Sequence, residues 1–141
     1  MKIQVKKINP EAILPKFSQA GDVAADLYAA KDIILKPDEI ISCPTGVAMK
    51  IPKGYSGLIW DKSGPSHKFG LKTLGGVIDN NYTGEILVGL INLGKEKFEI
   101  KKDQKIAQML FQKIETPDFE EVEDLPNTNR GERGFGSTGI F

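Results

Sequence analysis

Glycine and proline interrupt this chain so often that no long helix fits between them. The 141 residues include 15 glycines and 8 prolines, spread along the whole length. Both residues disfavour a helix interior, glycine through its backbone freedom and proline through its missing N–H group. The segments between them are short and rich in Val and Ile, and several alternate apolar with polar residues, which is typical of half-buried strands. The expected strands cover residues 2–8, 32–37, 39–44, 46–52, 55–62, 85–94 and 98–102.

Residues 105–114, KIAQMLFQKI, are compatible with a helix or a strand. Ile106, Leu110 and Ile114 share one face of a helix at four-residue spacing, and the same side chains lie on one side of a strand. The many short strands elsewhere favour a strand here. We therefore expect an all-β protein, a jelly-roll-like β barrel with one short helix at most.

Composition divides the chain into three parts. Residues 1–114 carry all the expected strands, and their number suffices for one β-barrel domain with its own core. Residues 115–129 are acidic and contain prolines, which is typical of a linker that runs over the surface. Residues 130–141, RGERGFGSTGIF, are rich in glycine and predict a flexible C-terminal arm.

Charge and cysteine content limit the possible partners. Nineteen basic and nineteen acidic side chains balance, so the chain as a whole does not attract nucleic acid, although a local cluster would suffice for a polyphosphate. Cys43, the only cysteine, cannot form an intrachain disulfide and favours a reducing compartment. No apolar run approaches membrane-spanning length. We expect a soluble cytoplasmic protein with no nucleic-acid and no membrane partner.

The stretch GGVIDNNYTGEI, residues 75–86, is the most informative candidate site. Asn80 and Asn81 suit a tight turn, which places Asp79 and Tyr82 around it. In one interpretation Asp79 caps the turn of a hairpin and Tyr82 packs on a sheet, and spacing alone favours this one. In the other, Asp79 is a general base and Tyr82 is a flat wall against a ring.

Residues 61–66, DKSGPS, combine a cation, a hydroxyl and a glycine backbone at a possible helix start. Asp61 or Ser63 could cap this helix, and Pro65 could occupy an early position in it. The combination also suits a phosphate. Taken alone, a helix cap beside a surface lysine is the simpler interpretation.

Other polar and aromatic residues are less specific. Asp22 and Asp26 could help to hold Mg²⁺ through water, or could simply stabilise turns. His67 is the only histidine, and it lacks a second ligand at zinc spacing. Trp60 is expected in the core, and Gln108 on a sheet surface.

Five of these stretches, in this order, resemble the motifs of the all-β trimeric dUTPase family. The resemblance runs from AADLYAA, residues 24–30, to RGERGFGSTG, residues 130–139, and GGVIDNNYTGE and the terminal RGxxGFGSTG pattern are its most specific parts. That family hydrolyses dUTP to dUMP and pyrophosphate with Mg²⁺ and has a jelly-roll-like barrel. The resemblance therefore implies a dUTP-hydrolysing homotrimer whose sites are shared between subunits.

The resemblance also implies roles for residues in the 75–86 stretch. Asp79 would activate the water that attacks the α-phosphorus, and Tyr82 would lie against the deoxyribose. The β-hairpin after Gly76, with Val77 and Ile78, would present backbone groups to the edge of the uracil.

Phosphate and metal contacts are implied elsewhere. Ser63 and Gly64 would hold the α- and β-phosphates beside Lys62, with Gln108 nearby. Asp26 would support the Mg²⁺–triphosphate through water.

The arm would close over a substrate bound elsewhere in the trimer. Arg130, Ser137 and Thr138 would contact the terminal phosphates, while Phe135, next to Gly136, would stack on the uracil. The glycines would let the chain wrap closely around the triphosphate.

Two alternatives share this fold. A dCTP deaminase has a Glu as its general base on the strand after the third motif, and Gly89 stands at the position that corresponds here. A non-catalytic dUTP-binding protein is the other alternative. Lys62, where the family usually has Arg, is the feature that fits it, because Lys keeps the charge but loses the planar fork. Asp79 and Tyr82, both present, argue against it.

Overall fold

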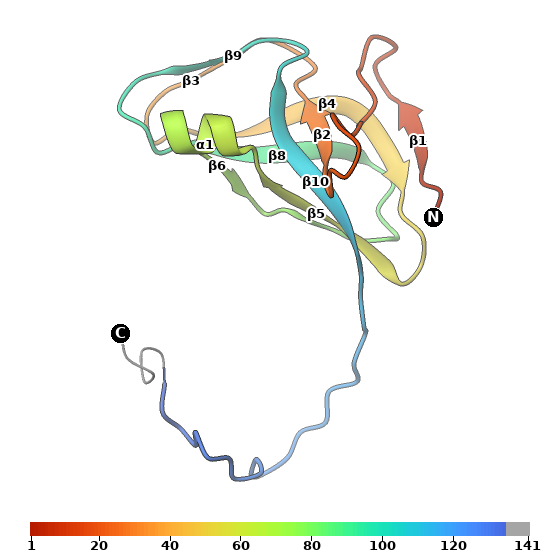
Figure 1. Cartoon of the computed structure of the whole chain (residues 1–141), viewed down its shortest axis with the longest axis vertical. Coiled ribbons are helices and arrows are strands. Elements are labelled where there is room, and N and C mark those ends of the chain that lie inside the picture. Colours follow the sequence, from red (N-terminus) through yellow and green to blue (C-terminus); the bar gives the residue numbers. More distant parts are fainter. Residues whose placement is uncertain (135–141) are drawn as a thin grey trace.

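The computed structural model describes residues 1–134, and these form mostly β-strands with one short helix (Figure 1). Two four-stranded antiparallel sheets and one two-stranded sheet make up the body. The first sheet contains, in spatial order, β1 (Gln4–Lys7), β4 (Ile40–Lys50), β8 (Glu85–Asn92) and β6 (Leu71–Leu74). The second contains β2 (Ala25–Tyr28), β10 (Lys105–Lys113), β5 (Tyr55–Asp61) and β7 (Val77–Ile78), and the third pairs β3 (Ile33–Leu35) with β9 (Phe98–Ile100).

The core is built by alternation along the strands, as the sequence predicts. In β8, Ile86, Val88 and Leu90 are fully buried, while Leu87 between them is exposed. This is the period of two that puts successive side chains on opposite faces of a sheet. Met109 of β10, in the other large sheet, belongs to the same buried cluster. Each such side chain contributes roughly 1.5–3 kcal/mol through burial, so the shared core holds the two large sheets together.

Most expected strands are confirmed. Residues 105–113 form a strand rather than a helix, as the surrounding strands favour. The segments 39–44 and 46–52 join into the single strand β4, which shifts register against β8 between Pro44 and Ala48. Gly46 has a φ of 71° inside this irregular stretch, a conformation that glycine adopts easily, so the strand continues through the break.

The strands β2 and β6 are absent from the pattern-based prediction. All four residues of β2 are buried, so the alternation that marks a half-buried strand is missing. β6 is only four residues long and lies between Gly70 and Gly75, both with positive φ. Both strands depend on partners that are distant in the sequence.

The expected short helix is α1 (Ser63–Phe69), but its cap differs from the prediction. Lys62 occupies the N-cap position, and no side chain of the described residues caps the first turn. Asp61 turns away and bonds to β6, while Pro65 lies in the first turn as expected. The helix ends at Gly70, which has a φ of 73° and donates its N–H to a helix carbonyl.

The predicted turn at residues 79–82 is confirmed, but the hairpin around it is wrong. The N–H of Tyr82 donates to the carbonyl oxygen of Asp79 at 3.2 Å, across Asn80 and Asn81. β7 pairs with β5, whereas β8 pairs with β4 and β6. The strands on either side of the turn therefore belong to different sheets, and the segment after Gly76 crosses from one sheet to the other.

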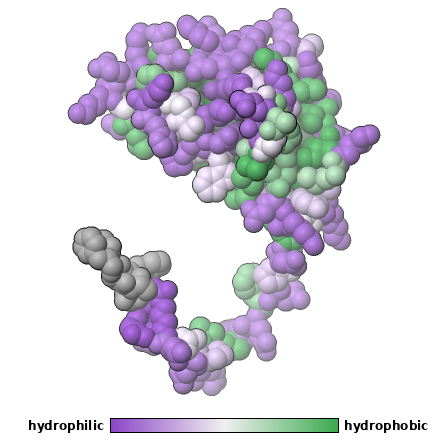
Figure 2. Space-filling view, viewed as in Figure 1, coloured by the Kyte–Doolittle hydropathy of each residue, from purple (hydrophilic) through white to green (hydrophobic). Residues whose placement is uncertain are grey.

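Residues 114–134 contain no helix or strand and lead away from the body in Figure 1. Their surface is mostly hydrophilic with a few apolar side chains, whereas hydrophobic side chains gather on one side of the body (Figure 2). Phe119 is 96% exposed in this segment. No helix among residues 1–134 is long and apolar enough to cross a membrane.

We expect Gly70→Ala to destabilise the protein. A Cβ at this position would lie 2.8 Å from the backbone nitrogen of Gly94, and alanine would also have to adopt a positive φ. Strain and overpacking together predict a loss of about 2–4 kcal/mol in the free energy of unfolding, measured in urea. Gly54→Ala is the control, because Gly54 has a φ of 82° but open space around it, so only the backbone cost of about 1 kcal/mol should remain. Equal losses in the two variants would contradict the steric part of this explanation.

Candidate active site

A cleft of about 530 Å³ lies beside α1, and three neighbouring strands contribute to it. The register of the second sheet explains this arrangement. Gln108 of β10 stands opposite Asp26 of β2 on one side and opposite Trp60 of β5 on the other. Lys62 and Ser63, at the start of α1, complete this wall. Residues that are far apart in the sequence therefore meet in one cleft.

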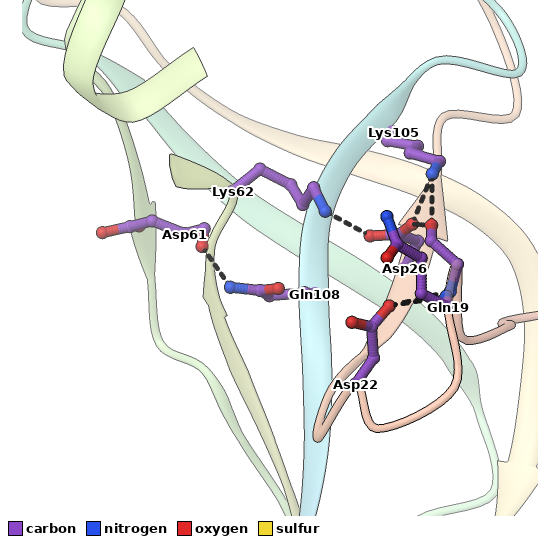
Figure 3. A network of polar contacts seen from close by, with 8 residues as sticks. Gln19, Asp22, Asp26, Asp61, Lys62, Lys105 and Gln108 are labelled. Atoms are coloured by element: carbon purple, nitrogen blue, oxygen red, sulfur yellow. Dashed lines mark hydrogen bonds and ion pairs between the residues drawn. The ribbon is translucent and has the colours of Figure 1, made fainter. Parts of the chain in front are cut away.

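Asp26 is the centre of the polar network in Figure 3. Its side chain is only 3% exposed, yet it accepts hydrogen bonds from three groups. Lys62 Nζ lies 2.6 Å from Oδ1, while Lys105 Nζ and Ser18 Oγ each lie 2.7 Å from Oδ2. A buried carboxylate requires such partners, because its charge is costly to remove from water without compensation.

These contacts keep Asp26 ionised. Burial alone would raise the pKa of its carboxyl, but the hydrogen bonds from Lys105, Lys62 and Ser18 outweigh burial and lower the pKa to about 2. The same contact with Asp26 raises the pKa of Lys105. The network therefore holds one negative and two positive charges at neutral pH.

The other carboxylates of the cleft are engaged in the fold. Asp22 accepts the backbone N–H groups of Ser18 and Gln19, at 3.1 and 2.9 Å, and so stabilises a turn. Asp61 accepts the backbone N–H and the hydroxyl of Thr73, both at 2.7 Å, and pairs with Lys72 at 3.0 Å. Burial opposes these bonds, but they lower the pKa of Asp61. Neither side chain is a free base.

Several other polar and aromatic side chains line the cleft. Ser63 is exposed at the first position of α1, followed by Gly64, where an added Cβ would meet open space. His67 is exposed and lines the cleft. The prediction that Trp60 lies in the core is wrong, because its side chain is 54% exposed and forms part of the cleft wall. Gln108 donates from Nε2 to the carbonyl oxygen of Asp61 at 2.9 Å, which fixes its amide in the cleft.

The 75–86 stretch lies apart from this cleft. Among the described residues, neither Asp79 nor Tyr82 lines it. Asp79 is exposed, and the Tyr82 hydroxyl donates to the carbonyl oxygen of Glu85 at 2.8 Å. The Tyr82 ring covers Gly84 so closely that a Cβ there would lie 2.6 Å from the hydroxyl.

The backbone before Asp79 is packed against β5. A Cβ at Gly76 would lie 2.4 Å from the carbonyl oxygen of Ile59, so only glycine fits there. Val77 and Ile78 form β7, in which Val77 is exposed and the carbonyl oxygen of Ile78 accepts the Ser56 hydroxyl at 2.8 Å. This short strand forms one edge of the second sheet, where it pairs with β5.

The predicted arm residues are placed only in part. Arg130 lies in a local turn, where its guanidinium donates to the carbonyl oxygens of Arg133 and Gly134 at 3.1 and 3.2 Å. It does not line the cleft formed by residues 1–134. The predicted contacts of Phe135, Gly136, Ser137 and Thr138 fall outside the described residues.

The prediction from sequence missed Lys105 and Ser18, which bind Asp26. A signal for Lys105 was available, since it is a charged residue at the start of an apolar strand, three positions before Gln108. Ser18 lies in a loop eight residues before Asp26, and no pattern indicates that the loop folds back.

The described residues do not form a metal cage of their own. No group of three or more His, Cys, Asp or Glu side chains among them could hold an ion. Magnesium is commonly held by one or two carboxylates, by water and by the phosphates of a substrate. Asp26 is ionised and lines the cleft, but its oxygens already accept from Lys62, Lys105 and Ser18, so it would support such an ion through water rather than as a direct ligand.

A mostly β fold with a cleft that combines lysine, serine, carboxylate and aromatic side chains defines a candidate site for a phosphorylated small molecule. Comparison with known proteins gives the family. The dUTPase family model matches residues 10–139, and the chain therefore belongs to the dUTPase family. Deoxyuridine 5'-triphosphate nucleotidohydrolases from Clostridium kluyveri and Nautilia profundicola are similar, at 44% and 43% identity. The first match covers 100% of both chains and the second 99% of both.

Solved structures agree with this assignment. A mutant dUTPase of Staphylococcus bacteriophage 80alpha with dUpNHpp has a TM-score of 0.89 at 30% identity, over 99% of both chains. A mutant dUTPase of phage phi11 of S. aureus, with a TM-score of 0.82 at 27% identity, covers 88% of this chain and 98% of its own. That structure is described as showing the coordination of a structural Mg(II) ion.

The ion pairs of Asp26 predict a specific dependence of stability on pH. The pKa of Asp26 is about 2 when folded against an ordinary value of 3.8, so its contribution is complete above pH 3.8 and is lost as the pH falls toward 2. We expect the free energies of unfolding of the parent protein and of Asp26→Asn to converge by about 2 kcal/mol between pH 5 and pH 2 in urea titrations. Parallel curves would show that this carboxylate does not titrate as its contacts require.

Proposed function

We propose that this protein hydrolyses dUTP to dUMP and pyrophosphate. The observation that carries the proposal is the meeting of Asp26, Lys62, Ser63 and Gln108 in one cleft. The relatives that match the full chain are named for the same reaction. Lys62 and Ser63 supply a cation and a hydroxyl for the α- and β-phosphates, with the backbone of Gly64 accessible beside them.

Asp79 is the general base of the proposed reaction. Its exposed carboxylate takes a proton from a water molecule, whose oxygen forms a bond to the α-phosphorus. The bond from the α-phosphorus to the bridging oxygen breaks in line, and the electron pair leaves with pyrophosphate. Lys62 stabilises the negative charge that develops on the phosphates. Asp26 would help to hold Mg²⁺ through water, and the ion would supply further neutralisation of the triphosphate.

The edge at β7 suits recognition of uracil. The carbonyl oxygens of Gly76 and Ile78 already accept the N–H of Ile59 and the hydroxyl of Ser56, so the backbone of Val77, between them at this edge, would offer the main donor and acceptor to the base. A narrow slot excludes the methyl group of thymine, and cytosine presents its donor and acceptor in exchanged positions. Tyr82 lies against the deoxyribose and disfavours a 2′-hydroxyl, which excludes UTP.

A homotrimer with shared sites would bring together the cleft and the turn that carries Asp79, which lie apart in one chain. In one chain Asp79 stands outside the cleft that holds Asp26 and Lys62, so a neighbouring copy supplies it. Exposed apolar side chains on the body, such as those of Val77 and Leu87, suit contact between copies. The core shared by the two large sheets supports a closed, jelly-roll-like barrel over residues 1–114.

The C-terminal part acts as a lid on this shared site. Residues 115–129 form the linker, and residues 130–141 form the arm that closes over the substrate of another subunit. Arg130, with Ser137 and Thr138, binds the terminal phosphates, while Phe135 and the adjacent Gly136 cover the uracil. Closure of such a segment excludes water from the reaction. The buried thiol of Cys43 suits a cytoplasmic, reducing environment.

Packing around Gly89 disfavours the dCTP deaminase alternative. A Cβ at this position would lie 2.7 Å from the carbonyl oxygen of Leu74, so a glutamate base does not fit there. A non-catalytic dUTP-binding protein of the same fold remains the second candidate, because Lys62 cannot make the two parallel bonds of an arginine.

Product analysis with the Asp79→Asn variant tests the proposed reaction. With Mg²⁺, the parent should release pyrophosphate from dUTP but not from dCTP, dTTP or UTP, and it should release no ammonia. Asp79→Asn should lower kcat by about 10²-fold or more while dUTP still binds, because the base is lost and the contacts are kept. Ammonia from dCTP would establish a deaminase, and dUTP binding without turnover by the parent would establish a binding protein.

Mixing two inactive variants tests the shared site. Asp79→Asn and Asp26→Asn should each be inactive as homotrimers. After they are unfolded and refolded together, about a quarter of the sites should combine an intact Asp79 from one chain with an intact Asp26 from another. Pyrophosphate release should return to about that fraction of the parent rate. No recovery, despite mixed trimers by mass spectrometry, would place both residues in the same chain's site.

A further inference from the structure

Two lysines approach Asp26 through different oxygens. Lys62 donates to Oδ1, whereas Lys105, together with Ser18, donates to Oδ2. Figure 3 shows the two ammonium groups reaching different oxygens of the carboxylate from different directions. Of these partners, only Lys62 lines the cleft formed by the described residues. Asp26 is therefore held at one oxygen from inside the cleft and at the other from outside it.

This arrangement contains one more cation than Asp26 needs. A buried carboxylate that loses its only cation is left with an uncompensated charge, which is strongly unfavourable. With Lys105 and Ser18 in place, Lys62 can leave Oδ1 and Asp26 still has a cation and a hydroxyl on Oδ2. The Lys62 side chain is 26% exposed, so an incoming phosphate can reach it.

We propose that Lys105 is a positioning residue that holds Asp26 while Lys62 moves from Asp26 to the phosphates of the substrate. The proposal rests on the proposed function, since it requires a phosphorylated substrate in the cleft. Before binding, Asp26 keeps the long Lys62 side chain in one place beside Ser63, which reduces the entropy lost when Lys62 binds phosphate. After binding, Oδ1 is free as an acceptor that faces the cleft.

The proposal predicts that Lys62 and Lys105 act together in substrate binding. Without Lys105, release of Lys62 would leave Asp26 with no cation, so Lys62 would stay on Asp26 and contribute little to phosphate binding. A lysine that only connects β10 with β2 would change stability and leave the contribution of Lys62 intact. A double-mutant cycle separates these two roles.

Calorimetric binding of dUpNHpp measures this cycle without turnover. The parent, Lys62→Met, Lys105→Met and the double variant are compared in EDTA, where no ion can replace Lys62 at Asp26, and again with Mg²⁺. Lys113→Met is the matched control, because Lys113 is exposed at the far end of the same strand and has no ion pair within residues 1–134. It removes the same charge and should leave the affinity unchanged.

In EDTA we expect Lys62→Met to weaken binding about tenfold in the parent, the effect of one charged hydrogen bond. In the Lys105→Met background the same substitution should weaken binding less than about threefold. Lys105→Arg should restore the full effect of Lys62, because it keeps a cation on Oδ2. Lys105→Gln, which keeps a donor without a charge, should behave like Lys105→Met and replaces it if that variant does not fold.

A tenfold effect of Lys62→Met in both backgrounds would overturn the proposed role of Lys105, and the proposed function would stand. A parent protein that binds dUpNHpp neither in EDTA nor with Mg²⁺ would reject the proposed function together with this inference. Thermal unfolding of every variant shows whether a loss of affinity merely follows a loss of folded protein.

Discussion

The position of β10 between β2 and β5 is the constraint on which the cleft depends. A strand that is paired on both sides fixes which residues stand opposite each other, because the hydrogen-bond ladders allow only one register at a time. Here that register places Gln108 beside both Asp26 and Trp60. A slip by one residue would turn Gln108 toward the core and Met109, now buried, toward the cleft. The packing of the core and the geometry of the cleft are therefore set by the same register.

The ion pairs of Asp26 with two lysines connect the fold to the proposed chemistry. Asp26 is buried for structural reasons, on a strand whose four residues are all inaccessible, and its burial requires cations. The chain supplies two, which leaves the network with one net positive charge before any substrate arrives. Asp22 and Asp61 also line the cleft, so the cleft as a whole carries no positive excess, but the Lys62 ammonium group that faces it is already ordered and partly desolvated. In the proposed function, the ion pairs that hold Asp26 therefore also place Lys62 for a phosphate.

The sequence predicts the parts of this protein that depend on local pattern and misses those that depend on distant partners. Alternation identifies β8, and turn residues identify the loop between Asp79 and Tyr82. The resemblance to dUTPases points to Asp26 and Gln108, which the structure brings together. The strands β2 and β6 and the crossing after Gly76 arise from pairing between remote segments, and composition carries no signal for such pairing. Trp60 was misplaced because an aromatic residue in a strand fits the core and a cleft wall equally well.

Asp79 and the cleft lie in two parts of the chain that are built differently. The cleft beside Asp26 is built from three strands, a loop and the start of α1, and its ion pairs form within one chain. The turn with Asp79 and Tyr82 connects two sheets at the surface, where a neighbouring copy can meet it. In the shared site proposed above, these two parts would come from different chains, so the reacting water, its base and the phosphates would meet only in the assembled protein. In the proposed shared site, assembly is therefore a condition for hydrolysis, because each chain would contribute its cleft to one site and its turn to another.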